Sequence, residues 1–157
     1  MRNIILIIFI ALSFGLNLSV LDYHNPSATH ILDAEVIHDL LIVTGMIGGI
    51  EFYDISTPES LNHLTSFNLS GGGGGGVKPN CIRATDNYAY ITTINGVAIV
   101  DISNPSNPQS LGYISGTNNL ILENLDIHED LLVVAAHEDG VRLYDISNPS
   151  DPIYIST

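Results

Sequence analysis

The sequence predicts an all-β protein assembled from three four-stranded antiparallel units. Three observations support this prediction: a ten-residue motif recurs three times, strand-forming residues alternate around each copy, and Gly, Asn, Ser and Pro residues separate the strands. Helix-forming runs rich in Ala, Glu, Lys and Arg are scarce. Repetition, alternation and turn chemistry therefore all favour short strands.

The recurring motif spans residues 49–58, 96–105 and 140–149 and reads Gly, four strand residues, Asp, Ile, Ser. Its aspartates are 47 and 44 residues apart: Asp54, Asp101 and Asp145. A further aspartate lies fifteen residues before each of them: Asp39, Asp86 and Asp130. This spacing predicts that the copies align without a gap over at least sixteen residues.

The second copy shows the expected strands most clearly, at residues 80–85, 88–93, 97–102 and 109–115. Asn95-Gly96 suits a tight hairpin, and the run 103–108 contains two prolines, which a central strand would not accept. Four antiparallel strands in about 45 residues are the pattern of a propeller blade. We therefore predict a partial, open β-propeller with repeats at about 34–70, 79–115 and 122–157.

Alternation along the third strand of each copy predicts which side chains form the core. One face carries only bulky apolar residues: Ile50 and Phe52, Val97 and Ile99, Val141 and Leu143. The opposite face carries Glu51 and Arg142 among its residues, so we expect it to be less buried.

The second and third copies resemble a known family of repeats. Val97 to Pro108 and Val141 to Pro152 are similar to the LVIVD repeat of bacterial surface proteins, and Ile50 to Pro58 resembles it with a shorter turn. The resemblance covers residues 30–157. It implies propeller-type blades in an exported or cell-surface protein, and it carries over no catalytic residue.

The net charge of −13, with only four basic residues, argues against nucleic-acid binding and against anionic lipid surfaces. It favours solubility, and it leaves open attraction of Ca²⁺ or of a basic partner. We expect no cofactor and no metal site. The single cysteine, Cys81, excludes an internal disulfide and is interpreted as a small buried hydrophobe.

The N-terminus resembles a secretory signal. A basic start at Arg2 precedes an almost wholly apolar stretch from Ile4 to Leu16, which is shorter than a membrane-spanning helix. We expect residues 1–20 to be a signal peptide, 21–33 a lead-in, and the mature chain to be periplasmic, surface-bound or extracellular, without a membrane span.

Three blades are fewer than the four that a closed propeller requires. An open stack leaves apolar blade faces exposed. The sequence leaves three explanations open: the chain is the N-terminal part of a longer protein, two copies pair into a six-bladed ring as a homodimer, or the array stands open.

The three motif aspartates could in principle ring a channel and hold a cation. Each, however, ends a strand before a Ser-containing turn, where a carboxylate accepts backbone N–H groups. We therefore interpret Asp54, Asp101 and Asp145 as structural turn residues.

A candidate ligand site lies at His137, Glu138 and Asp139, in the loop before the third motif. By analogy with other propellers, this loop shares a ligand-binding face with the Gly-rich segment 71–76, interpreted as a linker because no Lys-Ser/Thr follows it. Only one copy carries the cluster, so a symmetric site is not expected.

No zinc, serine-hydrolase or other catalytic motif stands out. The sequence therefore favours a non-enzymatic binding or scaffold module that presents its loop face to a protein or glycan. The alternatives are an enzyme, such as a hydrolase or lyase with its site in the central channel, and a structural spacer.

Overall fold

A computed structural model describes residues 29–157 except 48, 58, 70–77, 116 and 119. The expected signal peptide, most of the lead-in and the Gly-rich linker lie outside these described residues. No helix within the described part of the chain is long and apolar enough to cross a membrane.

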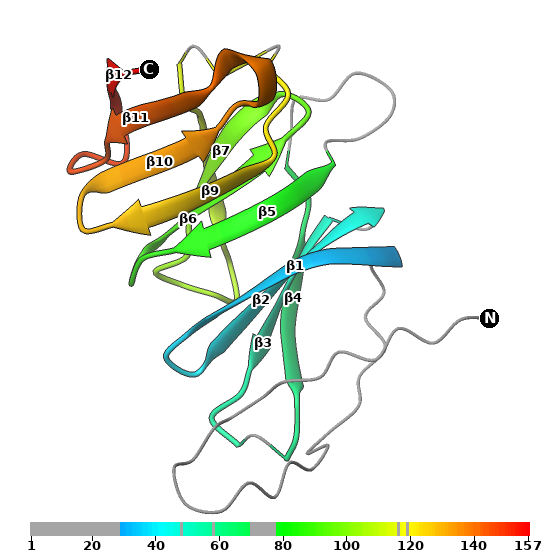
Figure 1. The fold of residues 1–157 in the computed structure, drawn as a ribbon. Coiled ribbons are helices and arrows are strands. Elements are labelled where there is room, and N and C mark those ends of the chain that lie inside the picture. The colour runs from blue at the N-terminus through cyan, green and yellow to red at the C-terminus, as the bar shows by residue number, and fades with distance from the viewer. Residues whose placement is uncertain (1–28, 48, 58, 70–77, 116, 119) are drawn as a thin grey trace, which may run out of the picture.

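The described residues form three four-stranded antiparallel sheets, as the sequence predicted (Figure 1). Within each sheet the strands are neighbours in chain order. Blade 1 contains β1 (Thr29–Ile37), β2 (Leu40–Ile47), β3 (Gly49–Asp54) and β4 (Asn62–Phe67). Blade 2 contains β5 (Pro79–Ala84), β6 (Tyr88–Thr93), β7 (Gly96–Asp101) and β8 (Gln109–Tyr113). Blade 3 contains β9 (Asn124–His128), β10 (Leu131–Ala135), β11 (Val141–Asp145) and β12 (Ile153–Ser156), with a short 3₁₀ turn, η1 (His137–Asp139), before β11.

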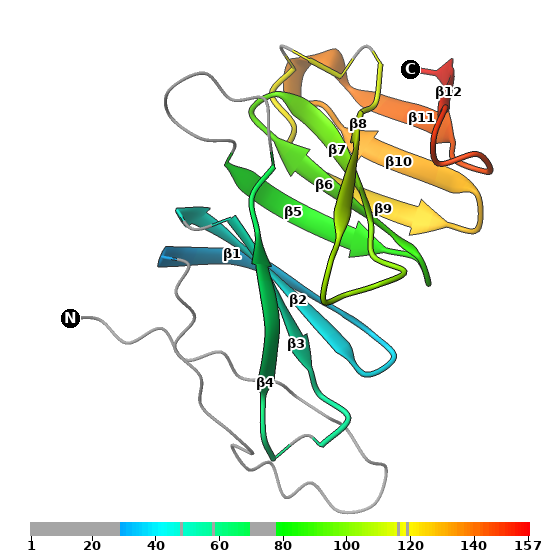
Figure 2. The same ribbon diagram turned by 180° about the vertical axis from the view of Figure 1, so that it is seen from behind.

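The blades meet at their first strands. β5 contacts β1 of the preceding blade and β9 of the following blade, and Figures 1 and 2 show these three strands side by side from opposite directions. The first strand of each blade is therefore the innermost one, and the later strands fan outward, as in a propeller.

Two apolar clusters lie between neighbouring blades, and both join one face of a blade to the opposite face of the next blade. We call the side of each blade that carries Phe52, Ile99 or Leu143 its leading face, and the opposite side its trailing face. The leading face of blade 1 packs on the trailing face of blade 2, through Ile50 and Phe52 against Ala98 and Val100. The leading face of blade 2 packs on the trailing face of blade 3 in the same way. Each interface therefore joins a leading face to a trailing face.

The expectation that the trailing face is less buried is wrong. Tyr53, Ala98 and Tyr144 lie on trailing faces and are almost fully buried, and so is Glu51, whose carboxylate accepts the Tyr53 hydroxyl. The leading face of blade 3 is the open one, with Val141 51% exposed. For Ala98 and Tyr144 the physical reason is stacking, because the preceding blade covers the trailing faces of blades 2 and 3.

The gapless alignment of the three copies is also wrong in blade 2. The first residue after the motif aspartate donates its N–H to the Asp39 carbonyl in blade 1 and to the Asp130 carbonyl in blade 3. In blade 2 the acceptor is Asn87, not Asp86. The two-residue loop of the β6–β7 hairpin is Ile94-Asn95, and not Asn95-Gly96 as expected, because Gly96 pairs with Thr93. This hairpin is one residue shorter than the β2–β3 and β10–β11 hairpins, so the residues before it are displaced by one position relative to the other copies.

Candidate functional site

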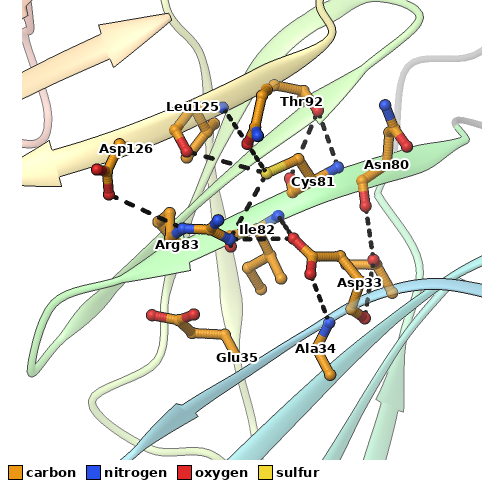
Figure 3. A network of polar contacts seen from close by, with 12 residues as sticks. Asp33, Ala34, Glu35, Asn80, Cys81, Ile82, Arg83, Thr92, Leu125 and Asp126 are labelled. Atoms are coloured by element: carbon orange, nitrogen blue, oxygen red, sulfur yellow. Dashed lines mark hydrogen bonds and ion pairs between the residues drawn. The ribbon is translucent and has the colours of Figure 1, made fainter.

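Charged and polar side chains gather where the innermost strands meet (Figure 3). Strand pairing places two sets of residues at equivalent positions on the leading faces of β1, β5 and β9. The first set is Asp33, Cys81 and Asn124; the second is Glu35, Arg83 and Asp126. The residues of blades 1 and 2 in these sets reach toward the innermost strand of the next blade.

Asp33 ties blade 1 to blade 2. Its Oδ2 accepts the backbone N–H of Ile82 at 3.0 Å and the Arg83 Nη1 at 3.1 Å, and its Oδ1 accepts the N–H of Ala34 at 2.9 Å. The neighbouring Glu35 accepts the N–H of Ala84 at 3.4 Å, and burial raises the pKa of its carboxyl. Both carboxylates therefore pair with the edge of β5.

Arg83 extends this contact to blade 3. Its Nε lies 3.9 Å from Asp126 Oδ1, while its Nη1 holds Asp33 on the other side. The Arg83 side chain is about one-third exposed, at 31%, and Asp126 is largely exposed, so the Asp126 pair is weak. One arginine thus lies between acidic groups from the two flanking blades.

Cys81 contributes packing to this region. Its thiol donates to Asn124 Oδ1 at 2.7 Å, and its Sγ lies 3.7 Å from Arg83 Nη1. Burial raises the pKa of Cys81 to about 11, so the thiol stays protonated at neutral pH. A protonated, buried thiol is a poor nucleophile, which agrees with its interpretation as a small core residue.

The three motif aspartates lie at the ends of β3, β7 and β11. Each Oδ1 accepts the backbone N–H of the serine two residues later, at 2.8 Å for Asp54, 2.9 Å for Asp101 and 2.8 Å for Asp145. The serine side chain and N–H lower the pKa of each carboxyl. This is the geometry that the turn interpretation requires.

Asp101→Ala is expected to lower the free energy of unfolding by about 1 kcal/mol, because the Ser103 N–H loses its acceptor. Asp101→Asn keeps an acceptor oxygen and serves as the control. Since the folded-state pKa of Asp101 is depressed below 3.8, its charge stabilises the fold above that value and this contribution is lost as the pH falls through the folded-state pKa. Urea unfolding at neutral pH and at about pH 2 measures the loss of stability caused by Asp101→Ala, which should be smaller at about pH 2. A loss that grows on acidification would contradict the stabilising role of the charge.

His137, Glu138 and Asp139 form η1, the exposed turn between β10 and β11. Their closest ionic partners are different residues: His137 Nε2 lies 3.9 Å from Glu123 Oε1, and Asp139 Oδ1 lies 4.0 Å from Arg142 Nη2. Among the described residues, no group of three His, Cys, Asp or Glu side chains is arranged to hold a metal. The three side chains of the turn are exposed.

Two exposed isoleucines lie at the same end of the blades as η1. Ile94, in the β6–β7 loop, is 58% exposed, and Ile121, in the connection from β8 to β9, is 65% exposed. This connection packs on the β6–β7 hairpin, where Thr117 Oγ1 accepts the Val97 N–H, and on blade 3, where Glu123 donates its N–H to the Ala135 carbonyl. We call this surface the loop end: Ile94, Ile121, Glu123, His137, Glu138 and Asp139.

Sequence reasoning missed the isoleucines of the loop end and the charged residues of the innermost strands. An isoleucine in a two-residue hairpin loop was a usable signal, because such loops prefer Asn, Asp and Gly. Asp33 and Glu35 were also detectable as charges at alternating positions of a strand, which places them on one face.

Three four-stranded blades joined at their innermost strands define a repeat protein of the propeller type. Residues 80–114 and 123–157, which form most of blades 2 and 3, match the family model of the LVIVD repeat. Blade 1 has the same strand order but lies outside the matched residues.

The fold is similar to the crystal structure of the computationally designed Ika8 protein, with a TM-score of 0.61 and 15% sequence identity. The match covers 82% of this chain and 37% of that chain, so this chain spans well under half of the designed protein. At this identity the likeness concerns the fold alone. No curated protein matches the sequence.

Proposed function

We propose that this chain is an exported, non-enzymatic binding or scaffold module of the periplasm or cell surface, and that its loop end recognises a protein or glycan. The basic start and apolar stretch at the N-terminus support export. The observation that carries the binding role is the exposure of Ile94 and Ile121 at the same end of the blades as the acidic turn η1.

The chemistry of the loop end favours a polypeptide partner. Exposed apolar side chains surrounded by polar residues are typical of protein-binding surfaces. Glu123, Glu138 and Asp139 add negative charge on a chain whose net charge is already −13, which attracts basic partners and repels acidic ones. We therefore expect a partner that combines Lys or Arg with apolar residues.

A non-enzymatic role is supported by the contacts of the most reactive residue types. Burial is the largest cause of the raised pKa of Cys81, about 11, so its thiol stays protonated at neutral pH and is a poor nucleophile. Asp33 and Glu35 accept N–H groups of β5.

Selection of random phage-displayed peptides on protein recovered from the exported fraction tests both parts of the proposal. We expect the mature chain in that fraction, and enriched peptides that are basic and apolar. Ile121→Asp should weaken their binding at least tenfold, because it replaces apolar contact with charge. Ile153→Asp, at a side chain of matched exposure (63%) on blade 3, is the control and should leave binding unchanged.

Two outcomes would contradict the proposal. Retention of the full chain in the cytoplasm would overturn export. Enriched peptides that bind the Ile121→Asp variant as well as the unaltered chain, or failure to enrich any, would overturn the loop end as the binding surface.

A further inference from the structure

The outer strand of blade 3 carries apolar side chains where the other blades carry polar ones. The outer strands β4, β8 and β12 begin with two residues at equivalent positions, since the first of them pairs with the motif aspartate of its own blade. These residues are Asn62 and His63 in blade 1, Gln109 and Ser110 in blade 2, and Ile153 and Tyr154 in blade 3. The repeat therefore folds with polar residues at both positions, and blade 3 departs from this pattern.

Stacking of the blades does not explain the departure. Both positions are exposed in blades 1 and 2, although the next blade packs on the leading faces of these two. In blade 3, Ile153 is 63% exposed and Tyr154 is 48% exposed, and Ile155 beside them is 53% exposed. We call this apolar surface, which lies outside the two interfaces between blades, the outer edge: Ile153, Tyr154 and Ile155.

The central side chain of the outer edge is already held in place. The Tyr154 ring packs edge-on against the Tyr144 ring, with the ring centroids 5.6 Å apart, and the Arg142 guanidinium lies 5.9 Å from the Tyr154 centroid. Tyr144 itself is buried, so it gives Tyr154 a fixed support. A contact through Tyr154 therefore costs less side-chain entropy than a contact through an unsupported side chain.

The distribution of charge favours a second copy of the chain as the partner of this edge. The net charge of −13 makes two copies repel each other at long range, but no side chain of β12 is charged. Asp145 pairs with Ile153, and in an edge-to-edge contact the two copies of Asp145 are about three strand spacings apart, roughly 14 Å. This separation exceeds the Debye length of about 10 Å at 0.1 M salt, so their repulsion is largely screened.

We propose that two copies of the chain associate through the outer edge, with the two β12 strands antiparallel. An antiparallel arrangement centred on Tyr154 places Tyr154 opposite its own copy and Ile153 opposite Ile155. Each apolar side chain of the outer edge then meets another apolar side chain. The pairing of β12 with β11 is irregular at Ile155, as it is at the equivalent positions of blades 1 and 2, so the contact rests on side chains rather than on a continuous ladder.

This dimer differs from a six-bladed ring, which would join the faces of blades rather than their outer strands. The outer edge is also separate from the loop end. Peptide binding at the loop end does not need the dimer, so each of the two proposals can fail alone.

Sedimentation equilibrium of the mature chain tests the association. We expect a reversible monomer–dimer equilibrium that Ile153→Gln weakens by about tenfold or more, because glutamine is the residue that blade 2 carries at this position. Ile94→Gln is the matched control. Ile94 has a similar exposure, 58%, but lies at the loop end, so this substitution should leave the equilibrium unchanged.

Tyr154→Cys tests the register of the two strands. Residues opposite each other in an antiparallel pair have the Cα separation that a disulfide needs, about 4.4–6.8 Å. With oxidised glutathione, which takes up the two electrons and two protons of the thiols, Tyr154→Cys should form a disulfide-linked dimer, and Ile94→Cys should not. Cys81 is buried and does not compete in this reaction.

Three outcomes would overturn the proposal. One is a chain that stays monomeric at every concentration up to about 1 mM. The second is a dimer that Ile153→Gln leaves unchanged and that Val141→Gln weakens, because the two copies would then meet through the leading face of blade 3. The third is failure of Tyr154→Cys to cross-link under conditions in which the unaltered chain is dimeric, which would exclude the antiparallel register.

Discussion

Replacing Ile99 with alanine is expected to lower the free energy of unfolding by about 3 kcal/mol. Ile99 lies on the leading face of blade 2, in the cluster with Tyr90, Leu132 and Val134, and is 3% exposed. Truncation leaves a cavity between blades 2 and 3. The two sheets cannot move together to fill it, because the contacts between their innermost strands fix their spacing. Urea unfolding followed by circular dichroism measures the loss, and Ile99→Val should give about a third of it.

The repeat itself supplies the matched control. Leu143 occupies the equivalent position in blade 3, with a side chain of the same size, but on the face that no further blade covers. Leu143→Ala should therefore cost only about 1 kcal/mol or less. Equal losses for the two variants would mean that the leading face of blade 3 is buried in solution, or that the interface between blades 2 and 3 contributes little.

The division into blades was predictable because its signals are local. A glycine before each third strand, an aspartate at its end and a serine two residues later fix a hairpin and a turn within ten residues. The contacts of Asp101 with Ser103 need no information from the rest of the chain. The repeat then carries the same local solution to the other copies.

The burial of each face was not predictable from alternation. Alternation shows that Glu51 and Tyr53 share a face but not whether another element covers it. A charged residue suggested exposure, yet Glu51 is buried with Tyr53 as its partner. The structural equivalent of Asp39 in blade 2 is Asn87, and the sequence did not show this. Loop length decides the register, and Asp86 stands next to Asn87, so the spacing of the aspartates suggested the wrong alignment.

The charged cluster of the innermost strands depends on contacts across about 50 residues. Arg83 meets Asp33 only because stacking brings β5 beside β1, and nothing in the local sequence of either residue names the other. The isoleucines of the loop end were visible in the sequence, but their exposure follows from the path of the connection between blades 2 and 3. In a repeat protein, the repeating units are therefore easier to predict from the sequence than the contacts between units.

Gly96→Ala is expected to lower the free energy of unfolding by about 3–4 kcal/mol, for two separate reasons. Gly96 has φ of +119°, a region that residues with a side chain rarely adopt. A Cβ atom there would also lie 2.4 Å from Thr117 Oγ1. That buried hydroxyl accepts the Val97 N–H at 3.0 Å and donates to the Ile114 carbonyl at 2.7 Å, so displacing it leaves a buried N–H unpaired.

Gly112 separates the two causes. It has nearly the same φ, +118°, but a Cβ atom there meets nothing within 4 Å. Gly112→Ala should therefore cost only the backbone strain, about 2 kcal/mol, and the excess for Gly96→Ala measures the collision with Thr117. Thermal and urea unfolding of both variants give the comparison. If Gly112→Ala is as destabilising as Gly96→Ala, strain alone accounts for both, and Thr117 does not hold the connection between blades 2 and 3 against the β6–β7 hairpin.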